Sequence, residues 1–157
     1  MTEFVRKVVG GIILVLILNG YITTPEQLKG EVDATELRYM SGASEIENGN
    51  ETGKYKDDVM RLLLTDSVIL NRINSKHWYG NNVEEVILAK GQYAPVTRNG
   101  FKTKKADDIT ILCAKYVLLY GSICPENVVY QGQSYNGSGL YKEIPVKGEK
   151  SEKFCFE

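Results

Sequence analysis

A run of apolar residues between positions 55 and 73 sets the tightest limit on how this chain can fold. The apolar positions recur at helical spacing and are Val59, Leu62, Leu63, Leu64, Val68, Ile69, Leu70 and Ile73. They cover a wide arc of a helix, which predicts that the helix is buried on most sides. A chain of 157 residues has room for one domain, so we expect this helix to lie at its centre.

Three shorter helices are predicted around the central one. They are expected at residues 34–40, 83–88 and 105–120. Asp33 and Asn82 precede the first two as N-caps, and Gly121 follows the third as a stop signal. The Asn-Gly step and the glycines of residues 44–53 are expected to end the first of these helices.

The last third of the sequence lacks the helical spacing of apolar residues seen in the earlier segments. Residues 127–131, 139–141 and 153–156 are β-branched or aromatic, and glycine-rich turns separate them. This pattern is typical of short strands. The sequence therefore predicts an α+β fold that is helix-rich first and extended last.

An uncharged apolar run, residues 8–18, follows a short basic start. Such a pattern is typical of a signal peptide, and even residues 8–22 fall short of the ~20 that a membrane span requires. We expect residues 1–22 to be a signal peptide or an uncleaved membrane anchor outside the domain. A linker at 23–32 and the domain at 33–157 would follow. The alternative is that the apolar run is a buried helix or strand of the folded domain.

Composition excludes several classes of function. Nineteen basic and twenty acidic side chains give a net charge of −1, which lacks the basic excess of a nucleic-acid-binding surface. His77 is the only histidine, and this argues against a zinc site built on several imidazoles. We expect no metal and no cofactor.

The three cysteines, Cys113, Cys124 and Cys155, form no CxxC pair. They also lack the Cys–His signature of a thiol peptidase. A disulfide between Cys113 and Cys124 is one interpretation, because they flank the end of a helix and the turn after it. The interpretation that we favour is three small buried side chains.

Four short segments, taken in chain order, carry a resemblance to a known family. They are ENGN at 47–50, SVILNRI at 67–73, VEEVI with GQYAPV at 83–87 and 91–96, and PENVVYQ with GSG at 125–131 and 137–139. The SleB/CwlJ-type cell wall hydrolases carry EAGN, VVLNRV, TIEEVI with GQYAPV, and ENVVYQ with GSG in the same order. The chain resembles this family, which includes spore-cortex-lytic enzymes, over roughly residues 37–156.

The resemblance implies a lysozyme-like domain related to lytic transglycosylases. It also implies cleavage of the peptidoglycan strand between N-acetylmuramic acid and N-acetylglucosamine, by a glutamate at the end of the first helix of the domain. Such a protein is exported or membrane-anchored and acts at the cell wall, in sporulation, germination or phage lysis. The expected partner is the glycan strand, with membrane association through residues 8–22. We expect a monomer that binds no nucleic acid.

The catalytic glutamate falls in a segment that departs from the family pattern. Several members carry GEARGE where this chain has SEIENGNE at residues 44–51. Glu47 matches best, because a Gly-Asn pair follows it as in EAGN. Glu45 is the rival.

Cleavage of a glycosidic bond requires an acid that protonates the leaving oxygen. Glycosidases with two carboxylates hold the partner roughly 5–9.5 Å away. A lytic transglycosylase can act with one glutamate, because the sugar's own 6-hydroxyl closes an anhydro ring. Both reactions stay open. The acid must lie against apolar or aromatic side chains that raise its pKa, and Tyr39, Ile46 and Tyr93 are the candidates.

Substrate contacts are expected from Asn71, Trp78, Gln92 and Tyr93, because amides bind N-acetyl groups and aromatic rings stack on sugars. The alternatives are structural. Asn71 and Arg72 would be a helix C-cap and a surface ion-pair partner, Gln92 a turn residue and Trp78 a cover for the core. The alternative function is a non-catalytic glycan-binding or cell-surface interaction protein on the same fold, in which the altered motif has lost its acid.

Overall fold

The computed structural model describes residues 2–48, 54–75, 77, 79–89, 93 and 105–157. Its elements in chain order are α1 (Glu3–Leu18), the short 3-10 helix η1 (Pro25–Gln27), α2 (Ala34–Glu47), α3 (Tyr55–Ile73), α4 (Val83–Leu88), α7 (Asp108–Tyr120), β1 (Val128–Gly132), β2 (Gly139–Ile144) and β3 (Glu152–Phe156). The described helices all precede the strands, so the α+β prediction is confirmed.

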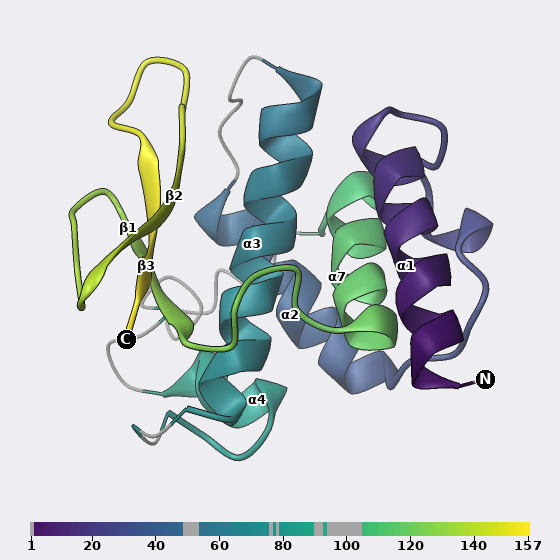
Figure 1. The fold of residues 1–157 in the computed structure, drawn as a ribbon, viewed down its shortest axis with the longest axis horizontal. Helices are drawn as coiled ribbons and strands as arrows, with labels where there is room; N and C mark the ends of the chain where they lie inside the picture. The colour runs from purple at the N-terminus through teal and green to yellow at the C-terminus, as the bar shows by residue number, and fades with distance from the viewer. Residues whose placement is uncertain (1, 49–53, 76, 78, 90–92, 94–104) are drawn as a thin grey trace.

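Helix α3 lies at the centre of the molecule, as its wide apolar arc predicts. The sheet lies on one side of α3, and α7 and α1 lie on the other (Figure 1). Leu63 and Ile69 are fully buried in a core shared with the other helices. Leu64 and Val68 are buried in a second core, beneath the sheet. The arc is wide because α3 contributes to both cores.

The strands form an antiparallel sheet in the order β1-β3-β2. Phe154 of β3 is fully buried and packs into the same core as Leu64 and Val68 of α3. Val128 of β1 and Ile144 of β2 complete that core. The three strands fall where the β-branched and aromatic segments predict them.

Helix α2 is longer than the sequence predicts. Its N-cap is confirmed, since the Asp33 carboxylate accepts a hydrogen bond from the Glu36 backbone N–H at 2.9 Å. The helix continues to Glu47, about two turns beyond the predicted end at Met40. The reason is that residues 41–44 are small and buried, which lets α3, α4 and α7 pack against α2.

The other helix boundaries agree more closely with the prediction. Asn82 caps α4, because its Oδ1 accepts from the Glu85 backbone N–H at 2.9 Å. Helix α7 begins at Asp108, three residues after the predicted start at Lys105, and ends before Gly121. Gly121 has φ of +95°, a conformation that favours glycine and ends a helix.

The N-terminal helix α1 belongs to the domain. It packs against α3 and α7, and Ile17 is fully buried in the helical core. At Gly10 a β-carbon would lie 2.9 Å from the ring of Tyr120, so glycine permits the close approach of α1 and α7. The Tyr116 hydroxyl donates to the Gly10 carbonyl at 2.9 Å. The prediction that this segment lies outside the fold was therefore wrong.

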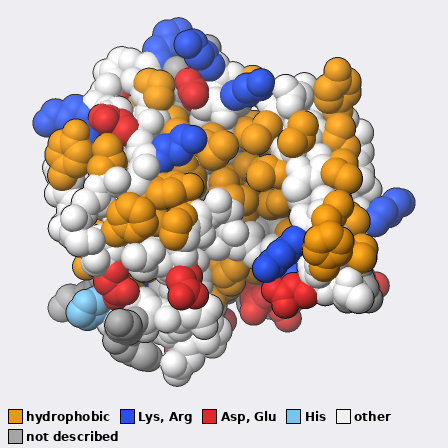
Figure 2. Space-filling model, viewed as in Figure 1, with side chains coloured by type: hydrophobic (Ala, Val, Ile, Leu, Met, Phe, Trp, Pro, Cys, Tyr) orange, Lys and Arg blue, Asp and Glu red, His pale blue; other side chains and the backbone are white. Residues whose placement is uncertain are grey.

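The outer face of α1 is apolar as well. Its exposed side chains are Phe4, Val5, Val8, Ile12 and Val15, at 43–77% exposure. Hydrophobic side chains accordingly line α1 along the edge of the molecule (Figure 2). No helix among the residues described is both long and apolar enough to cross a membrane. The pattern resembles a signal peptide because both faces are apolar, although only one is buried.

The segment predicted as a linker, residues 23–32, is also attached to the domain. Leu28 is 2% exposed and belongs to the helical core. The Lys115 ammonium on α7 donates to the carbonyls of Pro25 and Leu28 at 3.0 and 2.5 Å. These contacts join the segment to α7.

Candidate active site

The two glutamates proposed as the catalytic acid point in different directions. Residues two apart on a helix lie about 200° apart around its axis. Glu45 is 8% exposed, and its Oε2 accepts from the Thr110 hydroxyl of α7 at 2.6 Å. Glu47, the last residue of α2, is exposed to solvent. The structure thus gives Glu45 a partner inside the fold and leaves Glu47 accessible to a substrate.

The surroundings of Glu47 raise its pKa. The largest cause is displacement of water by neighbouring protein, and the second is the negative charge of Glu152 on β3. The positive charge of Arg72 opposes both. The side chain is therefore accessible at the surface and only partly hydrated. This combination suits a carboxyl group that must hold a proton until a substrate takes it.

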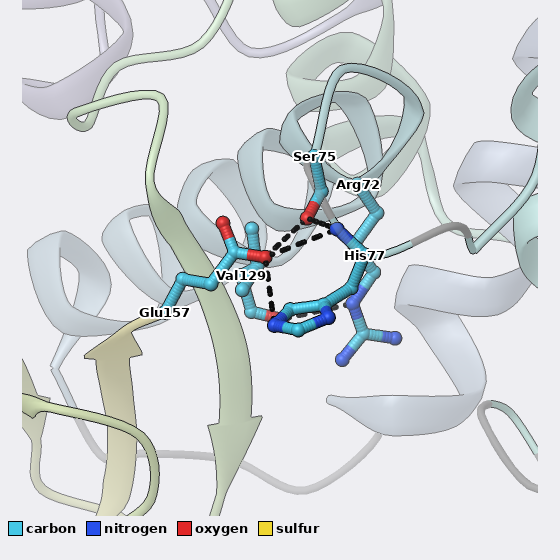
Figure 3. A network of polar contacts seen from close by, with 5 residues as sticks. All are labelled: Arg72, Ser75, His77, Val129 and Glu157. Atoms are coloured by element: carbon cyan, nitrogen blue, oxygen red, sulfur yellow. Dashed lines mark hydrogen bonds and ion pairs between the residues drawn. The ribbon is translucent and has the colours of Figure 1, made fainter.

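Arg72 is an interior residue rather than a surface ion-pair partner. It is 7% exposed, and its Nε donates to the Val129 carbonyl of β1 at 2.8 Å (Figure 3). Its guanidinium carbon lies 4.9 Å from the ring centroid of Tyr79 and 5.3 Å from that of Tyr93. Cation–π contacts on two rings and a backbone acceptor hold the guanidinium in place.

Tyr93 is the predicted substrate residue that the structure places near Glu47. It is 4% exposed, and burial raises its pKa to about 12, with the charges of Glu47 and Asp66 adding to the rise and Arg72 opposing it. Burial raises the pKa of Tyr79, and the neighbouring Tyr130 hydroxyl of β1 adds to the rise. A wall of aromatic side chains around Arg72 thus joins the end of α3 to the sheet.

Asn71 is buried, at 4% exposure. Its amide donates to the carbonyls of Pro125 and Val128 at 2.9 and 3.0 Å, and the C-cap of α3 is Asn74 instead. The amide thereby ties α3 to the segment that leads into β1. Sugar binding by Asn71 stays a prediction.

The other predicted residues divide into two groups. Trp78 and Gln92 lie outside the described residues. Ile46 packs partly buried against the helical core, and the Tyr39 hydroxyl donates to Glu84 of α4 at 3.2 Å. Tyr39 lies eight residues before Glu47, about 12 Å along the helix axis. Of the three side chains predicted to surround the acid, Tyr93 is the one whose contacts extend to Arg72.

Ser75, His77 and Glu157 form a contact group that does not have the geometry of a nucleophilic triad (Figure 3). The Ser75 hydroxyl donates to Glu157 Oε1 at 2.6 Å, and His77 Nε2 lies 3.6 Å from the same oxygen. The carboxylate lies between the serine and the imidazole, whereas a triad places the imidazole between the other two. This group joins the end of α3 to the end of β3.

The cysteines are buried and free. Cys113, Cys124 and Cys155 form no disulfide, which confirms the interpretation that we favoured. Burial is the largest cause of a raised pKa at Cys113 and at Cys124. Within the described part of the chain, no group of three or more His, Cys, Asp or Glu could hold a metal ion.

A separate hollow of about 370 Å³ lies beside η1, with Pro25, Leu37 and Lys115 among its lining residues. Leu37 is ten residues before Glu47 on α2, which is about 15 Å along the helix axis. The Lys115 ammonium is already bonded to two backbone carbonyls. This hollow is therefore distinct from the surroundings of Glu47.

Sequence reasoning did not identify Glu152, Arg72 or Tyr130 as neighbours of one site. One signal was available for Glu152, because strand alternation places it on the same face as the apolar Phe154. The inward direction of Arg72 had no sequence signal, since an arginine at a helix end is usually solvated. Comparison with models of protein families, with curated proteins and with solved structures finds no match for this chain.

Proposed function

We propose that this protein cleaves the glycan strand of peptidoglycan, with Glu47 as the general acid. One observation carries the proposal. Glu47 has a solvent-accessible carboxyl group with a raised pKa. It is the last residue of α2, and the middle of that helix is buried. The resemblance of four segments to the SleB/CwlJ-type cell wall hydrolases supports it, because that resemblance places the acid at the same residue.

The chemistry starts with a protonated Glu47. Its proton passes to the glycosidic oxygen as the bond to the anomeric carbon breaks. Glu47 then carries a negative charge, and the nearby positive charge of Arg72 stabilises that form. The charge of Glu152 favours the protonated form before the transfer. The two neighbours act in opposite directions, which keeps the pKa of Glu47 between the extremes that either one alone would produce.

The location of the proposed substrate determines where the protein would act. Peptidoglycan lies outside the cytoplasm, so we propose that the protein is exported and acts at the cell wall as a monomer. Because α1 belongs to the helical core, any assay should use the full chain.

The test is release of soluble fragments from purified peptidoglycan by wild type, Glu47→Gln and Glu45→Gln. The two variants make the same chemical change two residues apart. A glutamine at 45 keeps an oxygen that can accept from Thr110. We expect Glu47→Gln to lose about a hundredfold or more in rate and Glu45→Gln to retain most of it. Thermal unfolding of each variant checks that the fold is intact.

Three results would contradict the proposal. A wild-type rate from Glu47→Gln would remove Glu47 from the mechanism, and loss of activity in Glu45→Gln alone would move the acid two residues upstream. If the wild type sediments with peptidoglycan but releases no fragments, the alternative holds. The protein would then be a non-catalytic glycan-binding or cell-surface protein.

A further inference from the structure

The solvent-facing side of α1, called here its outer face, carries only apolar side chains. It consists of Phe4, Val5, Val8, Ile12 and Val15, which are 43–77% exposed. At 3.6 residues per turn these five positions fall within about 100° around the helix axis. Gly11 and Leu16 border the arc, and no residue of α1 within it is polar. The first polar residue in line with the arc is the C-cap Asn19, whose amide is bonded to the Val15 carbonyl at 2.8 Å.

Exposed aromatic side chains lie at both ends of α1. Phe4 is 77% exposed near the start of the helix, and Tyr21, three residues beyond its end, is 75% exposed. Tyr55 of α3 lies beside the same end, since its hydroxyl donates to the Ile17 carbonyl at 3.0 Å. Seven of the eleven exposed large hydrophobic side chains among the described residues are on α1 or at its ends. A concentration of this kind marks an interaction surface, whereas single exposed hydrophobic residues do not.

The charged residues of α1 lie beside the outer face and near the N-terminus. Lys7 pairs with Glu3 at 3.3 Å, and both side chains are well exposed, at 75% and 76%. The Arg6 Nη2 donates to the Leu119 carbonyl of α7 at 2.7 Å. Two positive charges and one negative charge give this end of α1 a net charge of +1. The apolar face is thus bordered by cations at one end.

The other side of α1 is held by the domain. Ile17 is fully buried, and a β-carbon at Gly10 would lie 2.9 Å from the ring of Tyr120 on α7. Lipid therefore cannot surround α1 while the domain is folded, and the helix can present only its outer face. That face lies along an edge of the molecule (Figures 1 and 2).

The chemistry of the outer face fits a lipid surface better than a protein. A protein interface contains about one hydrogen bond per 100–200 Å², and the outer face has no side chain that can form one. Acyl chains require no hydrogen bonds. Helices that lie in a membrane surface combine an apolar face with flanking Lys and Arg residues, and they insert that face about 5–10 Å deep.

We propose that α1 binds a lipid surface, lying in its plane with the outer face among the acyl chains and with Arg6 and Lys7 at the level of the phosphates. The domain binds as a folded unit, because the inner face of α1 stays packed against α3 and α7. The proposal does not depend on glycan cleavage. It assigns the predicted membrane association to the outward side chains of α1 and to Tyr21.

The experiment is cosedimentation of the full chain with vesicles of phosphatidylcholine, alone or mixed with phosphatidylglycerol. We expect wild type to bind both, about fivefold more tightly when anionic lipid is present, because one net positive charge near the surface contributes about 1 kcal/mol. Ile12→Ser should weaken binding about tenfold or more. Leu140→Ser is the matched control, since Leu140 is 39% exposed on β2, which lies on the other side of α3 (Figure 1). It should bind as wild type does.

Phe4→Ser and Tyr21→Ser test the in-plane orientation, because these residues lie at opposite ends of α1. We expect each substitution to weaken vesicle binding severalfold. All the substituted side chains are exposed, so circular dichroism and the unfolding temperature should match those of wild type. A loss from one end only would mean that the tip of α1 touches the lipid, and the in-plane orientation would be wrong.

Three further outcomes would overturn the proposal. The first is a wild type that does not bind vesicles. The second is equal loss of binding in Leu140→Ser and Ile12→Ser. The third is a wild-type dimer in sedimentation velocity that Ile12→Ser separates into monomers, which would assign the outer face to a second copy of the chain. Peptidoglycan cleavage is measured separately, so failure here leaves the proposed function standing.

Discussion

Asp66 is a carboxyl group in the middle of the helical core, and its replacement by asparagine tests how the interior is held together. It is 0% exposed on α3. Ser44 of α2 donates a hydrogen bond to its Oδ1, and its buried Oδ2 has no hydrogen-bond partner among the residues described. Burial raises the pKa of Asp66 well above that of an ordinary aspartic acid, against a smaller lowering by the hydrogen bond from Ser44. Burial therefore favours the neutral, protonated form of this group in the folded protein.

The sign of the pH dependence follows from proton counting. In the unfolded chain Asp66 ionises above about pH 3.9, while in the folded chain it stays protonated to higher pH. Between these two values the native state binds one more proton, so the free energy of unfolding falls as pH rises. The slope is about 1.4 kcal/mol per pH unit until pH reaches the folded-state pKa, and the loss is constant above it. Asp66→Asn has no ionisation there and lacks this slope.

Urea unfolding followed by circular dichroism at about pH 4.5, 5.5 and 6.5 measures the difference. We expect Asp66→Asn to gain about 1.4 kcal/mol over wild type per pH unit within the window. Neighbouring Cys113 and Tyr93 do not interfere, since burial raises both of their pKa values. Asp57→Asn, in the first turn of the same helix, controls for the loss of one negative charge. Parallel pH curves for wild type and Asp66→Asn would refute a neutral buried acid.

Two further predictions concern the contacts that unite the domain. Ile17→Ala should lower the free energy of unfolding by about 2–5 kcal/mol, because Ile17 is fully buried. Ile12→Ala, on the exposed face of the same helix, should change it by about 0.5 kcal/mol or less. Equal effects in urea unfolding would mean that α1 is not docked. Asn71→Ala leaves two interior carbonyls without their donor and should cost about 1–3 kcal/mol, whereas Asn74→Ala, at the exposed C-cap, should cost less. A stability equal to that of wild type would contradict the tie between α3 and the sheet.

Hydrophobic periodicity predicts the parts of this fold that apolar side chains hold together. The central helix at residues 55–73 and the three strands are where the pattern places them, because each buries apolar groups at the period of its own structure. The caps at Asp33 and Asn82 were predictable for the same kind of local reason, since each accepts a bond from a backbone N–H three residues later.

The spacing of apolar residues does not show whether a helix is buried in the domain when both of its faces are apolar. Helix α1 is apolar on its buried face and on its exposed face, so its sequence matches an export signal as well as a core helix. The decisive contact is Gly10 against Tyr120, 110 residues away. A contact between residues so far apart in sequence cannot be predicted from a local sequence pattern.

The candidate site shows the same division between local and long-range information. Glu47 was predictable as an acid only through the resemblance, because a glutamate in a polar segment is usually solvated. Arg72 was not predictable as an interior residue. Its burial depends on the rings of Tyr79 and Tyr93 and on a carbonyl of β1, and these partners come from three other parts of the chain.

The packing of α2 explains why Glu45 is buried and Glu47 is exposed. Beyond Met40, the middle of the helix is buried through small and polar residues. Ser44 bonds to Asp66 of α3, and Glu45 accepts from Thr110 of α7. Any rotation of α2 about its axis would break both bonds and leave buried polar groups unpaired, at about 1–3 kcal/mol for each group. These two interior hydrogen bonds therefore fix the rotation of the last turn, and that rotation is what directs Glu47 outward.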